Sequence, residues 1–244
     1  MNLVIDIGNT LVKLAVFNKN ELIFNKNYDS LTPLEVQEIL NRFNIVHSII
    51  SNVRNTANNL ENLLSTSTNF YQLNEQILLP FQNLYATPTT LGKDRMALIA
   101  AACNLFPQQN VLVVDMGTCI TYDVVTADKK YFGGAISPGL NMRFKALNQF
   151  TGNLPLVEIT ENEKPNLIGD STINSIKSGV YNGVKTELEG IIASYNKQYE
   201  NIQVVLTGGN AEMFDLESKN RIFADKFFLL KGLNEILEYN AKNK

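Results

Sequence analysis

The sequence predicts an α/β fold of two related halves, each with a mixed β-sheet flanked by helices. The first observation is a repeat: residues 4–17 read VIDIGNTLVKLAVF, and residues 113–126 read VVDMGTCITYDVVT. Each copy is an apolar run ending in Asp, with Gly and a hydroxyl residue close behind and a second apolar run after them. This pattern is typical of a β-hairpin with a tight turn. The second observation is the length, because 244 residues are enough for two domains, expected at 1–108 and 109–244.

In the first half, turn and helix-start signals define the elements. Short polar turns separate three apolar runs near the N-terminus, which predicts consecutive strands. Thr32 is a candidate N-cap with Pro33 at the first helical position, and Pro107 ends an Ala- and Leu-rich segment. The expected elements are strands at 2–7, 11–17 and 21–26, a helix at 32–43, a strand at 45–53, a loosely ended helix in the polar stretch after it, and a helix at 92–106.

The second half repeats the start of the first. Three apolar runs again precede a helix, and a long helical pattern follows that contains three glycines. The expected elements are strands at 111–115, 119–126 and 131–137, helices near 139–149 and at 172–199, a strand at 202–207, a helix after the TGGN turn, a short strand near 226–229, and a helix at 232–242. This order fits two RNase H-like domains of the actin-like ATPase kind, with an ATP cleft between them.

Composition limits the possible functions. The net charge of −3 argues against nucleic acid as the main partner, and 45% hydrophobic residues fit a globular protein. No run of 18 apolar residues predicts a membrane helix, and a strand at the N-terminus leaves no room for a signal peptide. Cys103 and Cys119 have no metal-ligand spacing and are expected to be reduced in a cytoplasmic protein. Because His47 is the one histidine, proton transfer is expected to rely on carboxylates.

The first hairpin turn carries groups suited to phosphate. Gly8 permits a tight turn and a close approach of phosphate, while Asn9 and Thr10 can donate hydrogen bonds. Lys13 supplies positive charge, and Asp6 can hold Mg²⁺ through water. An ordinary hairpin turn would explain the same residues if they occurred once.

The recurrence of the motif in the second half favours phosphate binding. Asp115 would serve a second cation or the outer shell of the metal, and Thr118 would contact the nucleotide phosphates.

The start of the helix at 92–106 carries an acid beside a base. Asp94 can simply favour the positive end of the helix dipole, with Arg95 on the surface. Asp94 can also accept a proton from a substrate hydroxyl that attacks ATP, with Arg95 holding an anionic group. The residues alone leave both interpretations open.

Three Gly-containing segments add weaker signals. The segment GGAISPG at 133–139 can place a helix N-terminus against an anion or form a structural corner. The segment GDST at 169–172 is an N-cap pattern. The segment TGG at 207–209 would let an adenosine lie on the backbone.

Taken together, the motifs resemble those of the type III pantothenate kinases, members of the acetate and sugar kinase, heat-shock ATPase and actin superfamily. The resemblance covers nearly the whole chain and follows the order of the family. It rests on DIGNT at 6–10, LGKDR at 91–95, DMGTCITYD at 115–123, GGAISPG at 133–139, GDST at 169–172 and TGGN at 207–210.

The resemblance implies ATP-dependent phosphorylation of pantothenate, the first step of coenzyme A synthesis, in a homodimer whose partner subunit helps to build the pantothenate pocket. It implies that Asp94 is the general base and that Mg²⁺ and a monovalent cation, K⁺ or NH₄⁺, are needed. Asp115 matches the ligand of the monovalent cation. The ATP-phosphate site matches Asp6, Gly8, Asn9, Thr10, Lys13 and Thr118, and the pantothenate contacts match Tyr85, Gly92, Lys93, Asp94, Arg95 and Thr172.

Rival functions are weaker. A phosphatase of the same fold would share the two hairpins but would not require the GKDR helix start. A non-catalytic ATP-binding regulator is disfavoured by the intact Asp94. Two isolated cysteines exclude a sugar kinase with a cysteine-rich zinc motif, and the acidic charge disfavours a DNA-binding regulator. Fold analogy alone would not decide between these functions, so the GKDR and GDST motifs carry the prediction.

Overall fold

The computed structural model describes residues 1–53, 58–216 and 222–243. The chain forms two compact units. The first consists of Met1–Pro107, Lys129–Phe132 and Phe227–Lys244, and the second of Gln108–Asp128 and Gly133–Lys226. The predicted domain boundary at residue 108 stays a prediction, and each unit is described by itself below.

The first unit contains a five-stranded mixed sheet in the order β3-β2-β1-β4-β5. Strands β1, β2 and β3 form an antiparallel meander, whereas β4 and β5 run parallel to β1. Strand β1 is buried along its whole length, which explains its nearly continuous apolar sequence. The strands are β1 (Asn2–Ile7), β2 (Val12–Asn18), β3 (Glu21–Tyr28), β4 (His47–Asn52) and β5 (Asn69–Gln72).

The α-helices of this unit, among the residues described, are α1 (Pro33–Arg42), α2 (Asn58–Ser67), α3 (Lys93–Leu105) and α6 (Phe228–Lys242). Helix α1 begins with a capping box, in which Thr32 and Glu35 satisfy each other's backbone N–H groups. Val36 and Ile39 of α1 and Leu64 of α2 pack on the β1–β2 core. A short 3₁₀ helix, η1 (Pro88–Thr90), precedes α3.

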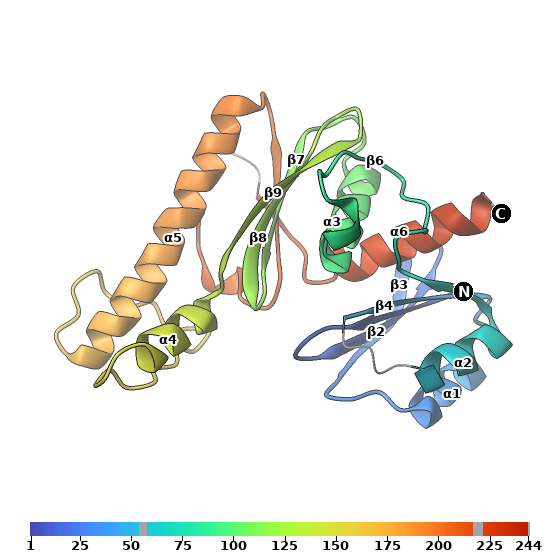
Figure 1. Cartoon of the computed structure of the whole chain (residues 1–244), viewed down its shortest axis with the longest axis horizontal. Helices are drawn as coiled ribbons and strands as arrows, with labels where there is room; N and C mark the ends of the chain where they lie inside the picture. The colour runs from blue at the N-terminus through green and yellow to red at the C-terminus, as the bar shows by residue number, and fades with distance from the viewer. Residues whose placement is uncertain (54–57, 217–221, 244) are drawn as a thin grey trace. The chain divides into compact units, whose positions relative to one another are not determined.

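Helices α3 and α6 lie side by side (Figure 1). Their contact is close because Gly232 has no side chain: a Cβ there would lie 1.7 Å from the carbonyl oxygen of Ala97. Buried amides tie α6 to the sheet. Asn2 donates to Asn234, at 2.9 Å, and Asn234 donates to the carbonyl of Lys19, at 2.9 Å. The C-terminal helix is therefore an integral part of the first unit.

The second sheet has the order β11-β10-β7-β8-β9-β6. Strands β7 and β8 form the second hairpin, and β10 and β11 extend the sheet in parallel from β7. Strand β6 pairs in parallel with the start of β9, at Lys130 and Tyr131, and this pairing lies within the first unit. The strands are β6 (Gln82–Asn83), β7 (Val111–Met116), β8 (Cys119–Val125), β9 (Lys130–Pro138), β10 (Gln203–Thr207) and β11 (Ile222–Ala224).

Helices α4 (Leu140–Gln149) and α5 (Thr172–Gln198) belong to the second unit. The buried side of α5, including Val184 and Leu188, shares one hydrophobic core with Leu112, Val114 and the other inward residues of β7, β8 and β10. A 3₁₀ helix, η2 (Ala211–Met213), follows β10. In the described residues, no helix has the length and apolar character needed to cross a membrane.

The predicted α/β class with mixed sheets and flanking helices is confirmed, but some elements differ. The predicted strand near 226–229 is wrong: the strand is Ile222–Ala224, and α6 already begins at Phe228. Phe228, Leu229 and Leu230 are all buried, and a short apolar run of this kind does not distinguish a strand from a buried helix. After TGGN, the described residues up to 216 contain the three-residue η2 and no α-helix. Strands β5 and β6 were not predicted.

Candidate functional site

The β1–β2 turn has the tight backbone expected of the first motif. The N–H of Gly8 donates to the carbonyl of Leu11 at 3.1 Å, and a Cβ at Gly8 would lie 3.2 Å from the same oxygen. Asn9 and Thr10 are exposed at the tip of the turn. Both side chains therefore lie on the surface that a ligand approaching the turn would meet.

Asp6 is buried at the end of β1, with 7% of its surface exposed. It faces Lys13 across the β1–β2 ladder and Ser51 across the β1–β4 ladder. Burial raises the pKa of Asp6 to about 6; Lys13 and a hydrogen bond from Ser51 oppose this rise, and the charge of Asp94 adds to it. A bound cation would favour the ionised carboxylate, and the predicted Mg²⁺ role of Asp6 stays a prediction.

The start of α3 lies in the same electrostatic neighbourhood, since Asp94 acts on the pKa of Asp6. Asp94 is exposed, and its Oδ1 accepts the backbone N–H of Arg95 at 2.8 Å. Gly92 leaves space for this carboxylate, because a Cβ there would lie 2.4 Å from Oδ1. Nζ of Lys93 donates a hydrogen bond of 2.8 Å to the carbonyl of Asn52 at the end of β4. The helix start is thereby fixed beside the ends of β1 and β4.

An aromatic stack supports Arg95. Its guanidinium carbon lies 5.4 Å from the ring centroid of Tyr85, and the Arg95 residue is only 4% exposed. Tyr85 stacks on the buried Tyr131, with centroids 6.2 Å apart and planes at 26°. Phe81 and Tyr131 form a T-shaped pair, with ring centroids 6.0 Å apart and planes at 75°. Tyr85 and Arg95, predicted to bind the same substrate, are thus in contact.

The β7–β8 turn repeats the first turn in the second unit. The N–H of Gly117 donates to the carbonyl of Cys119 at 3.0 Å, Asp115 is half-buried and Thr118 is exposed. The loop after β10 packs directly on this motif. Gly208 has φ +92°, and a Cβ there would lie 2.4 Å from Oδ1 of Asp115.

The GGAISPG corner contacts the same hairpin. A Cβ at Gly139 would lie 2.3 Å from the carbonyl oxygen of Thr118, and one at Gly134 would lie 1.7 Å from that of Tyr122. Both glycines are therefore required for close backbone packing. Gly139 is also the residue before α4 and has no side-chain cap.

Thr172 opens α5 and is exposed. The hydrogen bonds around it are local: Ser171 caps the helix by accepting the N–H of Asn174 at 3.2 Å, and Asp170 accepts the Asn174 amide at 2.6 Å. Gly169 packs closely on Ser175. The predicted N-cap pattern is confirmed, whereas the predicted substrate role of Thr172 stays a prediction.

Sequence reasoning missed the contribution of β4. Ser51 hydrogen-bonds Asp6, and the carbonyl of Asn52 receives Lys93. The sequence HSIISN of β4 contains a local indication of this role, because the polar residues Ser51 and Asn52 follow two apolar residues at the end of the strand. This strand pairs in parallel with β1. Sequence reasoning also missed Arg143 and Glu187, which form an ion pair in the second unit at 2.5 Å.

Comparisons with solved structures support the fold. The chain matches a structure titled as a conserved putative Baf family transcriptional activator from Campylobacter jejuni with a TM-score of 0.61 and 21% identity, over 98% of this chain and 99% of that one. It matches a putative N-acetylglucosamine kinase from Porphyromonas gingivalis with a TM-score of 0.53 and 12% identity, over 99% and 100% of the two chains. At these identities the likeness shows the fold alone, and it confirms the predicted pair of RNase H-like domains.

Sequence comparisons reach further. A family model described as type III pantothenate kinase matches residues 2–194. A type III pantothenate kinase of Christiangramia forsetii is 50% identical over 98% of this chain and 99% of its own length. A type III pantothenate kinase of Phocaeicola vulgatus is 45% identical over 99% of this chain and 100% of its own length. By these matches over nearly its whole length, the chain belongs to the type III pantothenate kinase family.

Proposed function

We propose that this chain transfers the γ-phosphoryl group of ATP to the primary hydroxyl of pantothenate, giving 4′-phosphopantothenate, the first step of coenzyme A biosynthesis. The observation that carries the proposal is the family match over residues 2–194, a span that contains every site residue assigned above. We place the reaction in the cytoplasm, in keeping with the reduced cysteines expected from the sequence.

Asp94 is the proposed general base. Phosphoryl transfer has a loose transition state, so the enzyme mainly positions the reactants and stabilises charge. Asp94 is exposed, its carboxylate accepts a hydrogen bond from the N–H of Arg95, and it packs closely against Gly92. It can therefore accept the proton of the attacking hydroxyl without first leaving a buried ion pair.

The two hairpins would bind the phosphates of ATP. In the first unit Gly8, Asn9 and Thr10 offer the turn, and Lys13 offers a cation. In the second unit Thr118 offers a hydroxyl at the corresponding turn. Mg²⁺ bound near Asp6 would neutralise phosphate charge, and water and phosphate oxygens would complete its ligands. No cluster of three or more His, Cys, Asp or Glu side chains that could hold a metal ion occurs in the described residues.

Asp115 is the proposed ligand of the monovalent cation, K⁺ or NH₄⁺. Asp115 is half-buried, and its carboxylate packs against Gly208, which limits the movement of the carboxylate on that side. A cation there would add positive charge near the Thr118 turn.

Pantothenate would be bound beside α3. Arg95 would hold the carboxylate of pantothenate, because a planar guanidinium can bind a carboxylate through two parallel hydrogen bonds. Tyr85 lies on Arg95 and would contact the substrate chain. Gly92 and Lys93 would contribute through the backbone, because Nζ of Lys93 is hydrogen-bonded to Asn52. Thr172 would contribute from the start of α5.

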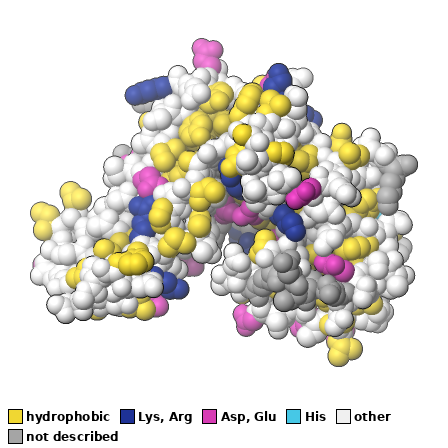
Figure 2. Space-filling view, in the orientation of Figure 1, with side chains coloured by type: hydrophobic (Ala, Val, Ile, Leu, Met, Phe, Trp, Pro, Cys, Tyr) yellow, Lys and Arg dark blue, Asp and Glu magenta, His cyan; other side chains and the backbone are white. Residues whose placement is uncertain are grey.

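A homodimer is the proposed assembly. Large apolar side chains of the second unit are exposed at the residue that ends α4, on the loop that follows it and at the start of α5, and Figure 2 shows hydrophobic side chains at the surface of this region. The loop is anchored to α5, because Ser178 donates to the carbonyl of Leu167 at 2.7 Å and Lys177 pairs with Glu163. An anchored apolar surface favours a protein partner. The residues and their exposed fractions are Phe150 (82%), Leu156 (53%), Leu167 (81%), Ile168 (85%) and Ile173 (49%).

The function is tested by measuring ADP release from ATP and Mg²⁺ with and without pantothenate, first in K⁺ and then in Na⁺ buffer. Release that requires pantothenate and K⁺ supports the proposal. Release that ignores pantothenate would favour the phosphatase, and ATP binding without turnover would favour the regulator. Sedimentation of wild type and Leu167→Asp tests the assembly: the wild type should have twice the mass of the chain and the variant should dissociate. A monomeric wild type would contradict the dimer.

A further inference from the structure

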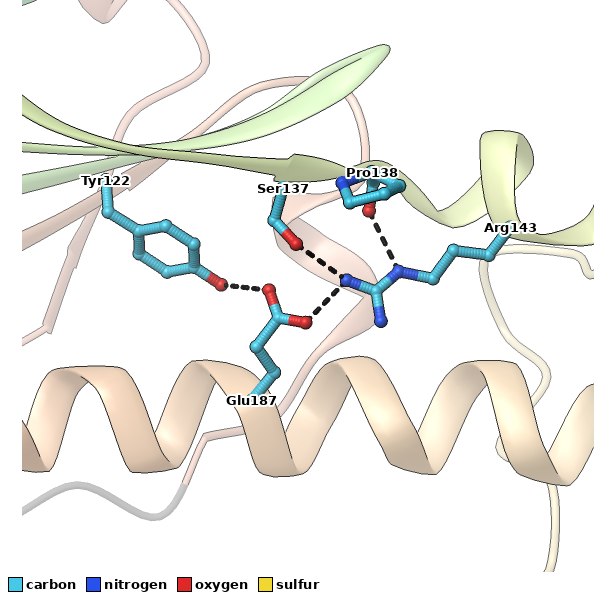
Figure 3. Close-up of polar contacts among 5 residues, drawn as sticks. All are labelled: Tyr122, Ser137, Pro138, Arg143 and Glu187. Atoms are coloured by element: carbon cyan, nitrogen blue, oxygen red, sulfur yellow. Dashed lines mark hydrogen bonds and ion pairs between the residues drawn. The ribbon is translucent and has the colours of Figure 1, made fainter. Parts of the chain in front are cut away.

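A polar network in the second unit joins four elements (Figure 3). Glu187 of α5 lies at its centre and accepts hydrogen bonds from Tyr122 of β8, at 2.9 Å, and from Arg143 of α4, at 2.5 Å. The Arg143 and Glu187 side chains are each 23% exposed. The network therefore lies at the edge of the core and is partly shielded from water.

Arg143 also holds the end of β9. Its Nε donates to the carbonyl of Pro138 at 2.9 Å, and its Nη2 donates to the hydroxyl of Ser137 at 3.0 Å (Figure 3). The planar guanidinium thus binds the GGAISPG corner and the carboxylate of Glu187 at once, an arrangement that the single ammonium of a lysine cannot reproduce.

The corner held by Arg143 touches the phosphate turn. The residue after Pro138 is Gly139, whose Cα packs on the carbonyls of Gly117 and Thr118: a Cβ would lie 2.7 and 2.3 Å from these two oxygens. A shift of the corner would therefore press on, or withdraw from, the backbone that carries the Thr118 hydroxyl.

Tyr122 gives the network a second connection to the same hairpin. It lies on β8, four residues after Thr118, and its carbonyl packs against Gly134 of the corner. Glu187 is thus linked to the hairpin through Tyr122 and to the corner through Arg143. Burial raises the pKa of Glu187, but hydrogen bonds from Arg143, Ser137 and Tyr122 outweigh this effect and lower the pKa overall. The carboxylate consequently stays ionised at neutral pH.

We propose that Arg143 and Glu187 are positioning residues that hold the Gly117–Thr118 turn in place for the phosphates of ATP. Neither side chain is assigned a contact with substrate; they act through Pro138 and Gly139. The proposal rests on the function proposed above, because that function assigns Thr118 to the nucleotide.

The test compares Glu187→Gln with Glu189→Gln. Glu187→Gln keeps the size of the side chain and removes the charge, whereas Glu189→Gln removes only a more exposed ion pair with Lys185 on the same helix. A misplaced phosphate turn should raise the KM for ATP and the Kd for Mg-ADP about fivefold in Glu187→Gln, and should leave the KM for pantothenate within about twofold of wild type. Glu189→Gln should match wild type in all three constants.

An unchanged Kd for Mg-ADP in Glu187→Gln would overturn the proposal. An equal rise in the KM values for ATP and pantothenate would also overturn it, because such a rise would indicate a general loss of structure and not a specific effect on the nucleotide site. If Glu187→Gln fails to fold, Arg143→Lys tests the proposal instead. The lysine keeps a positive charge beside Glu187 but cannot also hold Ser137 and Pro138 as the planar guanidinium does, so this variant should raise the Kd for Mg-ADP about threefold. If wild type binds Mg-ADP but does not phosphorylate pantothenate, the proposed function fails, and the Mg-ADP measurement still judges the positioning role.

Discussion

The Cα of Gly208 packs directly against the carboxylate of Asp115, so closely that a Cβ would lie 2.4 Å from Oδ1 and 2.6 Å from two backbone atoms of Met116. Gly208 also has φ +92°, a conformation that other residues rarely adopt. Two residues almost a hundred positions apart thus depend on each other: the glycine fixes one side of the carboxylate proposed to hold the monovalent cation.

We therefore expect Gly208→Ala to lower the free energy of unfolding by about 2 kcal/mol, from the strained φ together with the clash. It should also raise the K⁺ concentration needed for half-maximal activity, because Asp115 must move. Denaturant unfolding and a K⁺ titration of activity measure the two effects. Gly209→Ala is the matched control, because no atom lies within 4 Å of a Cβ at that position. Equal behaviour of the two variants would contradict this account.

Asp6 should make stability depend on pH in the absence of Mg²⁺. Its pKa rises from 3.8 to about 6 on folding, so its contribution to stability is fully present below about pH 3.8 and lost as the pH rises through about 6. The loss corresponds to about 3 kcal/mol.

Asp6→Asn removes this titration, so the variant should be more stable than wild type at pH 7.5 without Mg²⁺ and should lose this advantage toward pH 4. Urea unfolding of both proteins across this range measures the difference. Mg²⁺ should raise the stability of wild type above pH 6 and leave the variant unaffected. A difference between the two proteins that does not change with pH would show that Asp6 does not titrate as described.

Asp94→Asn should reduce kcat by about 10²-fold or more, because an amide cannot accept the hydroxyl proton. The asparagine oxygen can still accept the N–H of Arg95, so the helix start should persist and the Kd for Mg-ADP should stay within about twofold of wild type. Steady-state kinetics and nucleotide titration separate the two constants. A kcat close to that of wild type in a folded Asp94→Asn variant would show that Asp94 is not the general base.

The sequence predicted most of this arrangement, because the relevant signals are local. The hairpin turns at Gly8 and Gly117, the helix start at Lys93 and the N-cap at Ser171 each depend on a few adjacent residues. What it did not predict depends on contacts between distant segments. Ser51 reaches Asp6 only because β4 pairs in parallel with β1, and Glu187 reaches Arg143 only because α5 packs beside α4. Nothing in the sequence around Gly208 indicates that it would lie on Asp115.

Tyr131 shows how such a distant contact can bear on substrate binding. It is fully buried behind Tyr85, which in turn lies on Arg95. Tyr131→Leu removes the ring on which Tyr85 stacks and should raise the KM for pantothenate about fivefold, with little change in the KM for ATP. Tyr131→Phe keeps the ring and should restore the wild-type KM. Tyr199→Leu, which disrupts the similar Tyr195–Tyr199 stack at the C-terminal end of α5, is the control. Equal changes in both KM values would contradict a role specific to pantothenate.

Glycines at helix contacts and on helix surfaces should respond to alanine in opposite directions. A Cβ at Gly232 would lie 1.7 Å from the carbonyl oxygen of Ala97, so Gly232→Ala must push α6 away from α3 and should lower the free energy of unfolding by about 3 kcal/mol. Gly183 lies in the exposed part of α5 with no atom within 4 Å of its Cβ position. Gly183→Ala should therefore raise the free energy of unfolding by about 0.5–1 kcal/mol, because alanine loses less backbone entropy in a helix. Urea unfolding of the two variants measures both changes. A stabilised Gly232→Ala would mean that α3 and α6 do not make this close contact, and since the same contact places the C-terminal helix in the first unit, that part of the fold would then be wrong.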